Sequence, residues 1–228
     1  MVAAAEPLLP CSDPNGCPDL IVDQNKLKNW KIQTTNFSAD DCTVVEGETE
    51  AGTRTLLRFT FTTPNLGPGA LIVGDPNDHP ELFDFVTCHG HAHYKEYADY
   101  RLWTLNGYLK WQALRQANPG ALASELLAAN PAVAAKMVSG GKRGFCVVDV
   151  VRYLRTAVPA QYTSCDFQGI SVGWADQYGR QLDGQWVDIT GLARGKYMLE
   201  AEVNAERVFK ERVNGYSNNS AAVPVRIP

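Results

Sequence analysis

Three of the four histidines in this chain, His89, His91 and His93, stand at alternate positions within five residues. A β-strand points every second side chain to the same face, so on a strand these imidazole rings would converge on one point. A helix would spread them over roughly 200°, because its period is about 3.6 residues. Neutral imidazoles that face one point suit copper, zinc or nickel. We therefore predict a metal site formed by the three histidines; the alternative is a histidine-rich strand that holds no metal.

The identity of the metal decides which chemistry such a site could perform. Only copper and iron would bring redox chemistry with oxygen, and of these two copper is among the candidate metals. Three protein ligands would leave an open position for water or oxygen. The sequence also allows a hydrolytic zinc enzyme in which a carboxylate such as Glu96 assists the metal, but it contains no HExxH motif to support this alternative.

The composition bounds the class of protein. The chain has 228 residues, of which 45% are hydrophobic and 10% aromatic, enough for a substantial core in one large β domain or two small ones. The net charge of −4 argues against a nucleic-acid partner. No run approaches the roughly 18 apolar residues of a membrane span, so we expect none.

The six cysteines indicate the compartment. None of their spacings is CxxC, which argues against zinc ribbons and thioredoxin-like motifs. Cys11 and Cys17 are close enough in sequence to close a small loop around a turn. Three disulfides would place the protein outside the cytoplasm, secreted or periplasmic, whereas six buried thiols would fit a cytosolic protein. The first residues lack a basic stretch and a long apolar region, so we expect a mature form without its leader.

Short strands separated by turns are predicted over most of the chain. Residues 53–62 alternate as a strand. Residues 82–103 contain the histidine strand and a hairpin partner at 97–103. The Asn106-Gly107 pair predicts a turn into a further strand at 108–111.

Residues 118–139 have a different character. Their alanine and leucine content predicts two short helices that are split at Pro131 and lie over one end of the sheet. Strands return afterwards at 145–148, 185–190, 196–203 and 222–227. The pattern predicts an all-β protein, an antiparallel β-sandwich with a short helical insertion, in a single domain over 1–228 with an N-terminal disulfide loop at 1–17.

Several segments together resemble the lysyl oxidase family. Cys88 to Tyr94 is similar to the family's copper-binding stretch. The resemblance continues, in the same order and spacing, over roughly residues 18–228. The matching segments are Gly141 to Cys146, Asp176 to Gly179 followed by Gln185 to Thr190, and Tyr216 to Asn219.

This resemblance implies a copper amine oxidase with lysine tyrosylquinone, a cofactor made from the protein itself. Tyr178 would supply the ring and Lys142 the amine, while the three histidines would hold the copper. An unprocessed form could hold zinc and keep Lys142 away from Tyr178. The implied reaction converts a primary amine, free or peptidyl lysine, to an aldehyde with release of ammonia and hydrogen peroxide. The alternative is a non-enzymatic copper- or zinc-binding extracellular module.

The reaction also needs a base within hydrogen-bond reach of the substrate proton. We nominate Asp99, one strand away from the histidines, although the family has a histidine near this position. A surface or paired carboxylate is the alternative for Asp99. We expect Asp176, Asp183 and Glu81 to meet a cationic amine.

Lys142 and Tyr178 have structural alternatives of their own. Lys142 follows two glycines and could be a solvated loop lysine, which is what most lysines are. Tyr178 precedes a glycine and could be a turn tyrosine.

The sequence departs from the family at several positions. A cysteine pair that flanks the cofactor tyrosine is replaced by Trp174 and Gly184, and a further histidine is replaced by Val86. The resemblance implies a Cys88–Cys165 bridge, which leaves Cys42 to pair with Cys146.

Overall fold

The protein is described by a computed structural model that covers residues 11–12, 16–86, 88, 90–142, 144–212 and 215–228. Within these residues every paired strand runs antiparallel to its neighbour. The predicted all-β class is therefore confirmed. The strands form five small sheets, and one core cluster draws on residues from Leu20 to Ile227. No helix in the described part of the chain is both long and apolar enough to cross a bilayer.

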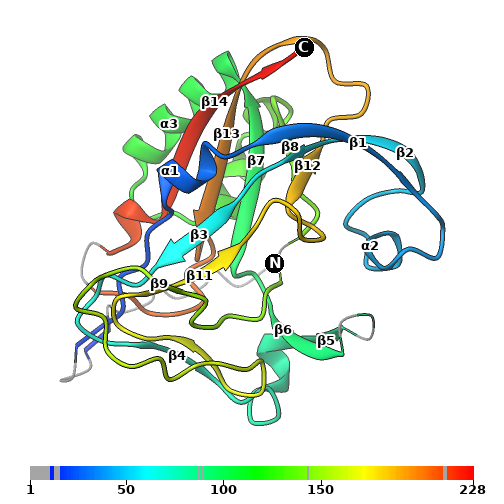
Figure 1. The fold of residues 1–228 in the computed structure, drawn as a ribbon. Helices are drawn as coiled ribbons and strands as arrows, with labels where there is room; N and C mark the ends of the chain where they lie inside the picture. Colours follow the sequence, from blue (N-terminus) through cyan, green and yellow to red (C-terminus); the bar gives the residue numbers. More distant parts are fainter. Residues whose placement is uncertain (1–10, 13–15, 87, 89, 143, 213–214) are drawn as a thin grey trace.

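The largest sheet has four strands in the order β14-β13-β7-β8 (Figure 1). These strands are β7 (Ala98–Thr104), β8 (Met137–Ser139), β13 (Gly195–Val203) and β14 (Ser220–Ile227). The strands predicted at 196–203 and 222–227 are confirmed as β13 and β14. Leu199, Ala201 and Val203 alternate along β13 and are fully buried in the core.

Four smaller sheets complete the fold. The strands of the two three-stranded sheets are β1 (Lys31–Phe37), β2 (Gly52–Arg58) and β12 (Trp186–Asp188), then β3 (Phe61–Pro64), β11 (Trp174–Tyr178) and β9 (Val151–Arg152). The two-stranded sheets pair β4 (Leu71–Gly74) with β10 (Gln168–Ile170) and β5 (Phe83–Val86) with β6 (His91–Tyr94). The remaining short helices outside the 105–134 region are α1 (Gln24–Leu27), α2 (Cys42–Val45), η1 (Pro80–Leu82) and η2 (Gly215–Asn218).

The histidine strand pairs with a different partner from the one predicted. β6 forms a hairpin with β5, in which His91 lies opposite Val86 and His93 opposite Asp84. The predicted partner at 97–103 becomes β7 and pairs with β13 and β8 instead. Glu96 has a left-handed φ of 53°, which turns the chain out of the hairpin before β7 begins. The hairpin therefore lies apart from the four-stranded sheet (Figure 1).

The predicted turn at Asn106-Gly107 is wrong, because these residues lie in the first turn of α3 (Leu105–Ala117). Thr104 caps this helix, and its hydroxyl accepts a hydrogen bond of 3.1 Å from the Gly107 amide. A Cβ at Gly107 would lie 2.5 Å from the Lys136 Cβ, so the glycine serves a close approach within a helix rather than a hairpin turn. The strand predicted at 108–111 is therefore helical.

The two short helices predicted within 118–139 are confirmed as α4 (Ala123–Ala129) and α5 (Pro131–Ala134). Their boundary falls at Pro131, which occupies the first turn of α5 as its missing amide donor allows. The helical region is longer than expected because it already begins at Leu105. α3 lies along one face of the four-stranded sheet (Figure 1).

α3 covers a group of buried charges on that sheet. Arg101 is 2% exposed, and its guanidinium lies 2.6 Å from Glu202 and 3.5 Å from Glu200. Glu200 also accepts hydrogen bonds from the indole nitrogens of Trp103 and Trp111. Burial raises the pKa of Glu200 despite the nearby Arg101. The face of β13 that carries Glu200 and Glu202 is therefore buried around charges.

We predict that Arg101→Met lowers the free energy of unfolding by about 3–5 kcal/mol, because it leaves the buried Glu200 without its cation and leaves Glu202 with Arg115 alone. The measurement is urea unfolding followed by tryptophan fluorescence. Arg54→Met is the matched control, since Arg54 pairs with the exposed Glu50 and such a pair contributes roughly 0–1 kcal/mol. Equal losses in the two variants would contradict the assignment of Arg101 as the centre of this group.

Candidate functional site

His91 and His93 lie side by side on β6, as the alternation of side chains along a strand requires. Their Nε2 atoms are 3.1 Å apart. Two nitrogen ligands at 2.0–2.1 Å from one metal ion would be separated by about 2.9 Å in square-planar and about 3.3 Å in tetrahedral geometry. The observed separation falls between these values, so the two imidazoles fit as ligands of one copper or zinc ion.

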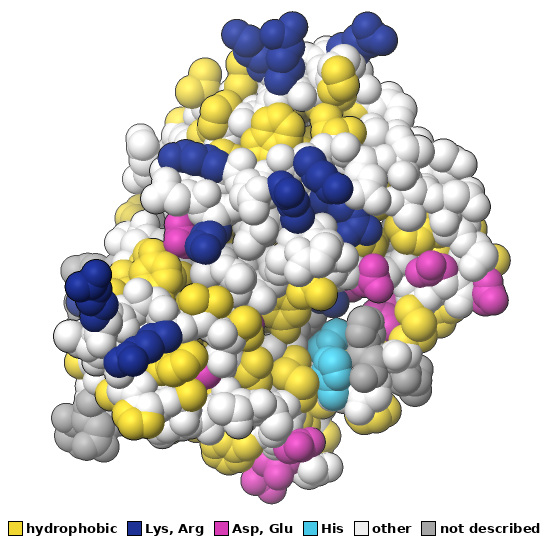
Figure 2. All heavy atoms as spheres, in the orientation of Figure 1, with side chains coloured by type: hydrophobic (Ala, Val, Ile, Leu, Met, Phe, Trp, Pro, Cys, Tyr) yellow, Lys and Arg dark blue, Asp and Glu magenta, His cyan; other side chains and the backbone are white. Residues whose placement is uncertain are grey.

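The third predicted ligand, His89, lies outside the described residues. Within the described part of the chain, no group of three or more histidine, cysteine, aspartate or glutamate side chains forms a metal cluster. His91 and His93 therefore account for the part of the predicted site that can be described. Figure 2 shows histidine rings at the edge of a surface hollow with acidic side chains close by.

A cavity of about 510 Å³ brings most of the predicted residues together. His91, His93, Lys142 and Tyr178 all line it. They come from β6, from the segment after β8 and from β11, which are far apart in the sequence. The apolar part of its wall comes from Val148, Val150 and Leu182 together with the Cys146 and Cys165 positions.

Tyr178 is the last residue of β11, where it pairs with Phe61 of β3. Its hydroxyl donates a hydrogen bond of 2.7 Å to the Cys146 carbonyl. The Phe145 ring packs edge-on against it, with 4.9 Å between the ring centroids. Burial raises the pKa of Tyr178, and the charge of Asp176 raises it further. Tyr178 is thus a fixed, neutral phenol in the cavity wall and not a turn tyrosine.

Lys142 is 4% exposed, which rules out the alternative of a solvated loop lysine. Its Nζ lies 3.2 Å from Oε1 of Glu48 and 5.6 Å from the centroid of the Phe145 ring. The same Phe145 ring therefore neighbours both the Lys142 amine and the Tyr178 phenol.

The strand predicted at 145–148 is reduced to a single bridge between Phe145 and Tyr94.

Asp176 is the most unusual carboxylate in this cavity. It is 1% exposed, and neither of its carboxylate oxygens has a hydrogen-bond partner among the described residues. Burial raises its pKa well above the ordinary value. Asp176 and Tyr178 are two residues apart on β11 and therefore share a face of the strand. A protonatable group thus stands beside the phenol.

The structure does not bring Asp99 to the histidines. Asp99 lies on β7, pairs with Arg101 and lines a separate cavity of about 100 Å³. Of the three acidic residues expected to meet a cationic amine, Asp176 and Asp183 line the histidine cavity. Glu81 is exposed, with an oxygen 3.6 Å from His79 Nδ1.

Two of the three expected disulfides are wrong. The structure pairs Cys42 with Cys88 and Cys146 with Cys165, at Cα–Cα distances of 5.8 and 5.4 Å. Cys146 and Cys165 come together because the Val147 amide binds the Gln168 side chain, which also donates to the Cys165 carbonyl. The Cys11–Cys17 bridge is confirmed.

The C-terminal motif Tyr216 to Asn219 has a structural role. The side-chain amide of Asn219 donates a hydrogen bond of 2.6 Å to the buried Glu211 carboxylate, which also accepts one from the backbone amide of Leu20. Asn218 donates to Asp19. The motif thus ties the C-terminal region to the segment around residue 20.

Sequence reasoning missed the roles of two carboxylates, Asp176 and Glu48. The spacing of Asp176 and Tyr178 on a predicted strand was a usable signal, because residues two apart share a face. Glu48 offered no local signal, because it lies 94 positions from Lys142. Its contact depends on tertiary packing.

Comparison with known proteins shows that the chain is similar to one family. A family model described as Lysyl oxidase matches residues 124–227. The chain is 30% identical over 171 residues to lysyl oxidase homolog 2 of Xenopus tropicalis, which covers 74% of this chain and 18% of that protein. It is 25% identical over 234 residues to lysyl oxidase homolog 1 of Homo sapiens, covering 92% of this chain and 33% of that protein. The chain spans about a third or less of the length of these curated relatives.

We predict that Asp176→Asn stabilises the metal-free protein at pH 7. Below the ordinary pKa of 3.8, both the native and unfolded states carry the Asp176 proton, so the variant has no advantage. Above pH 3.8 the Asp176 carboxyl ionises in the unfolded state but not yet in the native state. The free energy of unfolding of wild type therefore falls by about 1.4 kcal/mol for each unit by which the native pKa exceeds the unfolded one. Unfolding curves from pH 3 to pH 8 measure the difference.

The exposed Asp183, at the same cavity, provides the control variant Asp183→Asn. The difference in unfolding free energy between Asp183→Asn and wild type should not grow with pH in the way expected for Asp176→Asn. An Asp176→Asn curve that runs parallel to wild type over the whole range would show that the carboxyl is not destabilised by burial.

Proposed function

Because this chain belongs to the lysyl oxidase family, we propose that it is an extracellular copper amine oxidase that deaminates primary amines oxidatively. The observation that carries the proposal is a single cavity lined by an imidazole pair, a lysine, a tyrosine and a buried carboxylate. The residues are His91, His93, Lys142, Tyr178 and Asp176. The products would be an aldehyde, ammonia and hydrogen peroxide.

His91 and His93, with His89 as the third ligand, would hold the metal in this proposal. Copper, when bound, would supply redox chemistry with oxygen at an open coordination position. A precursor that holds zinc instead is part of the same proposal. The 3.1 Å separation of the two Nε2 atoms supports a shared ion.

Lys142 and Tyr178 would form lysine tyrosylquinone, which supplies a carbonyl that condenses with a primary amine and passes its electrons to oxygen. The protein's part is to hold the Tyr178 ring in the cavity wall through the hydrogen bond to Cys146 and the contact with Phe145. Lys142 has to leave Glu48 to reach the ring.

We assign the role of base to Asp176 in place of Asp99. Asp176 lines the cavity beside Tyr178, and because burial raises its pKa, its ionised form is a stronger base than an ordinary carboxylate. Its carboxylate would accept the proton from the substrate carbon that bears the nitrogen. A cationic substrate in the cavity would also favour the ionised carboxyl.

The shape of the cavity supports an alkylamine as substrate. Its apolar lining at Val148, Val150 and Leu182 suits a methylene chain, and the exposed Asp183 suits a cationic group. A lysine side chain, free or within a peptide, has both features. We therefore propose lysine or peptidyl lysine as the substrate class.

We predict that the protein binds copper and that His91→Ala or His93→Ala weakens this binding. Each change removes one of the converging imidazoles. Dialysis against buffered copper, followed by elemental analysis, measures the bound metal. His79→Ala is the control, because His79 is exposed and pairs with Glu81 outside the cavity. Unchanged copper content in both site variants would refute the metal site.

We predict that copper loading in air produces a visible chromophore and an altered intact mass, since one oxygen atom is added and hydrogens are lost. Tyr178→Phe and Lys142→Arg should abolish both signals. Asp176→Asn should keep the metal but release peroxide from amines about 10²–10⁴-fold more slowly, the usual effect of a lost base. Asp99→Asn should retain activity. An unmodified wild-type mass without peroxide would leave a non-enzymatic metal-binding module.

A further inference from the structure

Glu48 is built into the site of Lys142. The Lys142 Nζ and the Glu48 Oε1 are 3.2 Å apart, and the two side chains are only 4% and 8% exposed. An ion pair in such surroundings is poorly screened by water and salt. The amine of Lys142 is therefore held by a charge at a defined place in the cavity wall.

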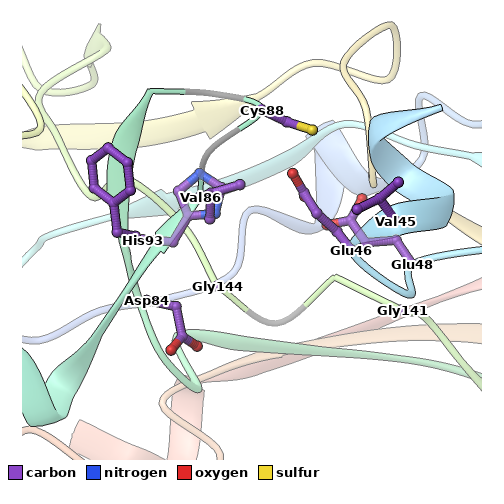
Figure 3. Close-up of a pocket in the computed structure, with 10 residues that line it drawn as sticks. Val45, Glu46, Glu48, Asp84, Val86, Cys88, His93, Gly141 and Gly144 are labelled. Carbon is purple, nitrogen blue, oxygen red and sulfur yellow. The ribbon is translucent and has the colours of Figure 1, made fainter. Parts of the chain in front are cut away.

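The backbone fixes where Glu48 lies. The Glu48 amide donates a hydrogen bond of 2.8 Å to the carbonyl of Thr43, a fully buried residue of α2. The Cys42–Cys88 bridge ties the start of α2 to the loop that leads into β6. Figure 3 shows Glu46 and Glu48 on one side of a neighbouring cavity of about 340 Å³ and His93 on the other.

Two glycines make room for the ion pair. A Cβ on Gly141 would lie 2.3 Å from the Glu48 carbonyl oxygen, so the backbones are in direct contact. A Cβ on Gly184 would lie 2.5 Å from Glu48 Oε2 and 2.6 Å from Lys142 Cδ. Any side chain at residue 184 would displace one partner.

We propose that Glu48 is a positioning residue that stores Lys142 as a paired ammonium and so delays its reaction with Tyr178. An ammonium has no lone pair and cannot attack the ring, whereas the neutral amine is a nucleophile. Because Phe145 neighbours both groups, Lys142 needs a local rearrangement to reach the ring and not a movement of whole strands. The delay rests on the proposed function, but the storage of Lys142 does not.

Dioxygen is the oxidant that joins Lys142 to Tyr178 in the proposed crosslink. Once Lys142 has left Glu48, its ammonium gives a proton to water. Dioxygen oxidises the Tyr178 ring to a quinone: one oxygen atom enters the ring, and the other leaves as water with the hydroxyl hydrogen and one ring hydrogen. The neutral nitrogen then bonds to a ring carbon of this quinone. The nitrogen and the ring carbon each give up one hydrogen, and these two hydrogens reduce dioxygen to hydrogen peroxide.

The storage of Lys142 can be tested in the metal-free protein. Trace acetylation with acetic anhydride, followed by peptide mapping, measures the reactivity of Lys142 against the exposed Lys26 and Lys110. Lys142 should react more slowly than both in wild type. In Glu48→Gln it should react about tenfold faster than in wild type, which corresponds to losing about 1.4 kcal/mol of pairing. Equal Lys142 reactivity in wild type and Glu48→Gln would overturn the proposal.

The delay is tested by adding copper in air and following the Lys142–Tyr178 crosslink by peptide mass spectrometry. Glu48→Gln should crosslink several-fold faster than wild type at equal copper content. Glu50→Gln is the control, because Glu50 is two residues away, exposed and paired with Arg54. An unchanged or slower rate in Glu48→Gln would overturn the delay. Absence of any crosslink in wild type, with Lys142 still protected from acetylation, would refute the proposed function while retaining the storage of Lys142.

Discussion

The alternation of side chains along β6 and β11 is the constraint on which the site depends. On β6 it places His91 and His93 together, with their Nε2 atoms 3.1 Å apart. On β11 it places Asp176 and Tyr178 on one face. A slip of one residue in either strand would turn its reactive side chains to the opposite face. The hairpin with β5 and the pairing with β3 set these registers, so two short sheets determine the chemistry of the cavity.

The environment, more than the residue type, separates the roles of three carboxylates. Asp99 is neutralised by Arg101, and Glu48 is paired with Lys142. Asp176 has no ion pair among the described residues, and its burial raises its pKa. A carboxylate that is already satisfied by a cation makes a poor base, because the cation stabilises its ionised form. This difference is the physical reason to prefer Asp176 over Asp99 as the proton acceptor.

Local patterns predicted the parts of the fold that depend on local forces. β13, β14 and the split of the helices at Pro131 follow from alternation and from the missing amide of proline. The strand partner of β6 and the helix at Leu105–Ala117 did not follow. Both depend on contacts between distant residues, such as the close approach of Gly107 to Lys136. The same limit explains the wrong disulfide pairs, since Cys42 and Cys88 are 46 residues apart.

The site itself was predictable wherever it lies on strands. The alternate spacing of His91 and His93 predicted that they act together, the family resemblance pointed to Tyr178, and all three line one cavity. The environment of Lys142 was not predictable, because its partner Glu48 comes from another segment and the space for both depends on the missing side chain of Gly184. A cofactor made from two side chains requires them to be near each other but not to react prematurely. In the proposed function the Glu48–Lys142 pair would meet both requirements, because it holds the amine near the same Phe145 ring that contacts Tyr178.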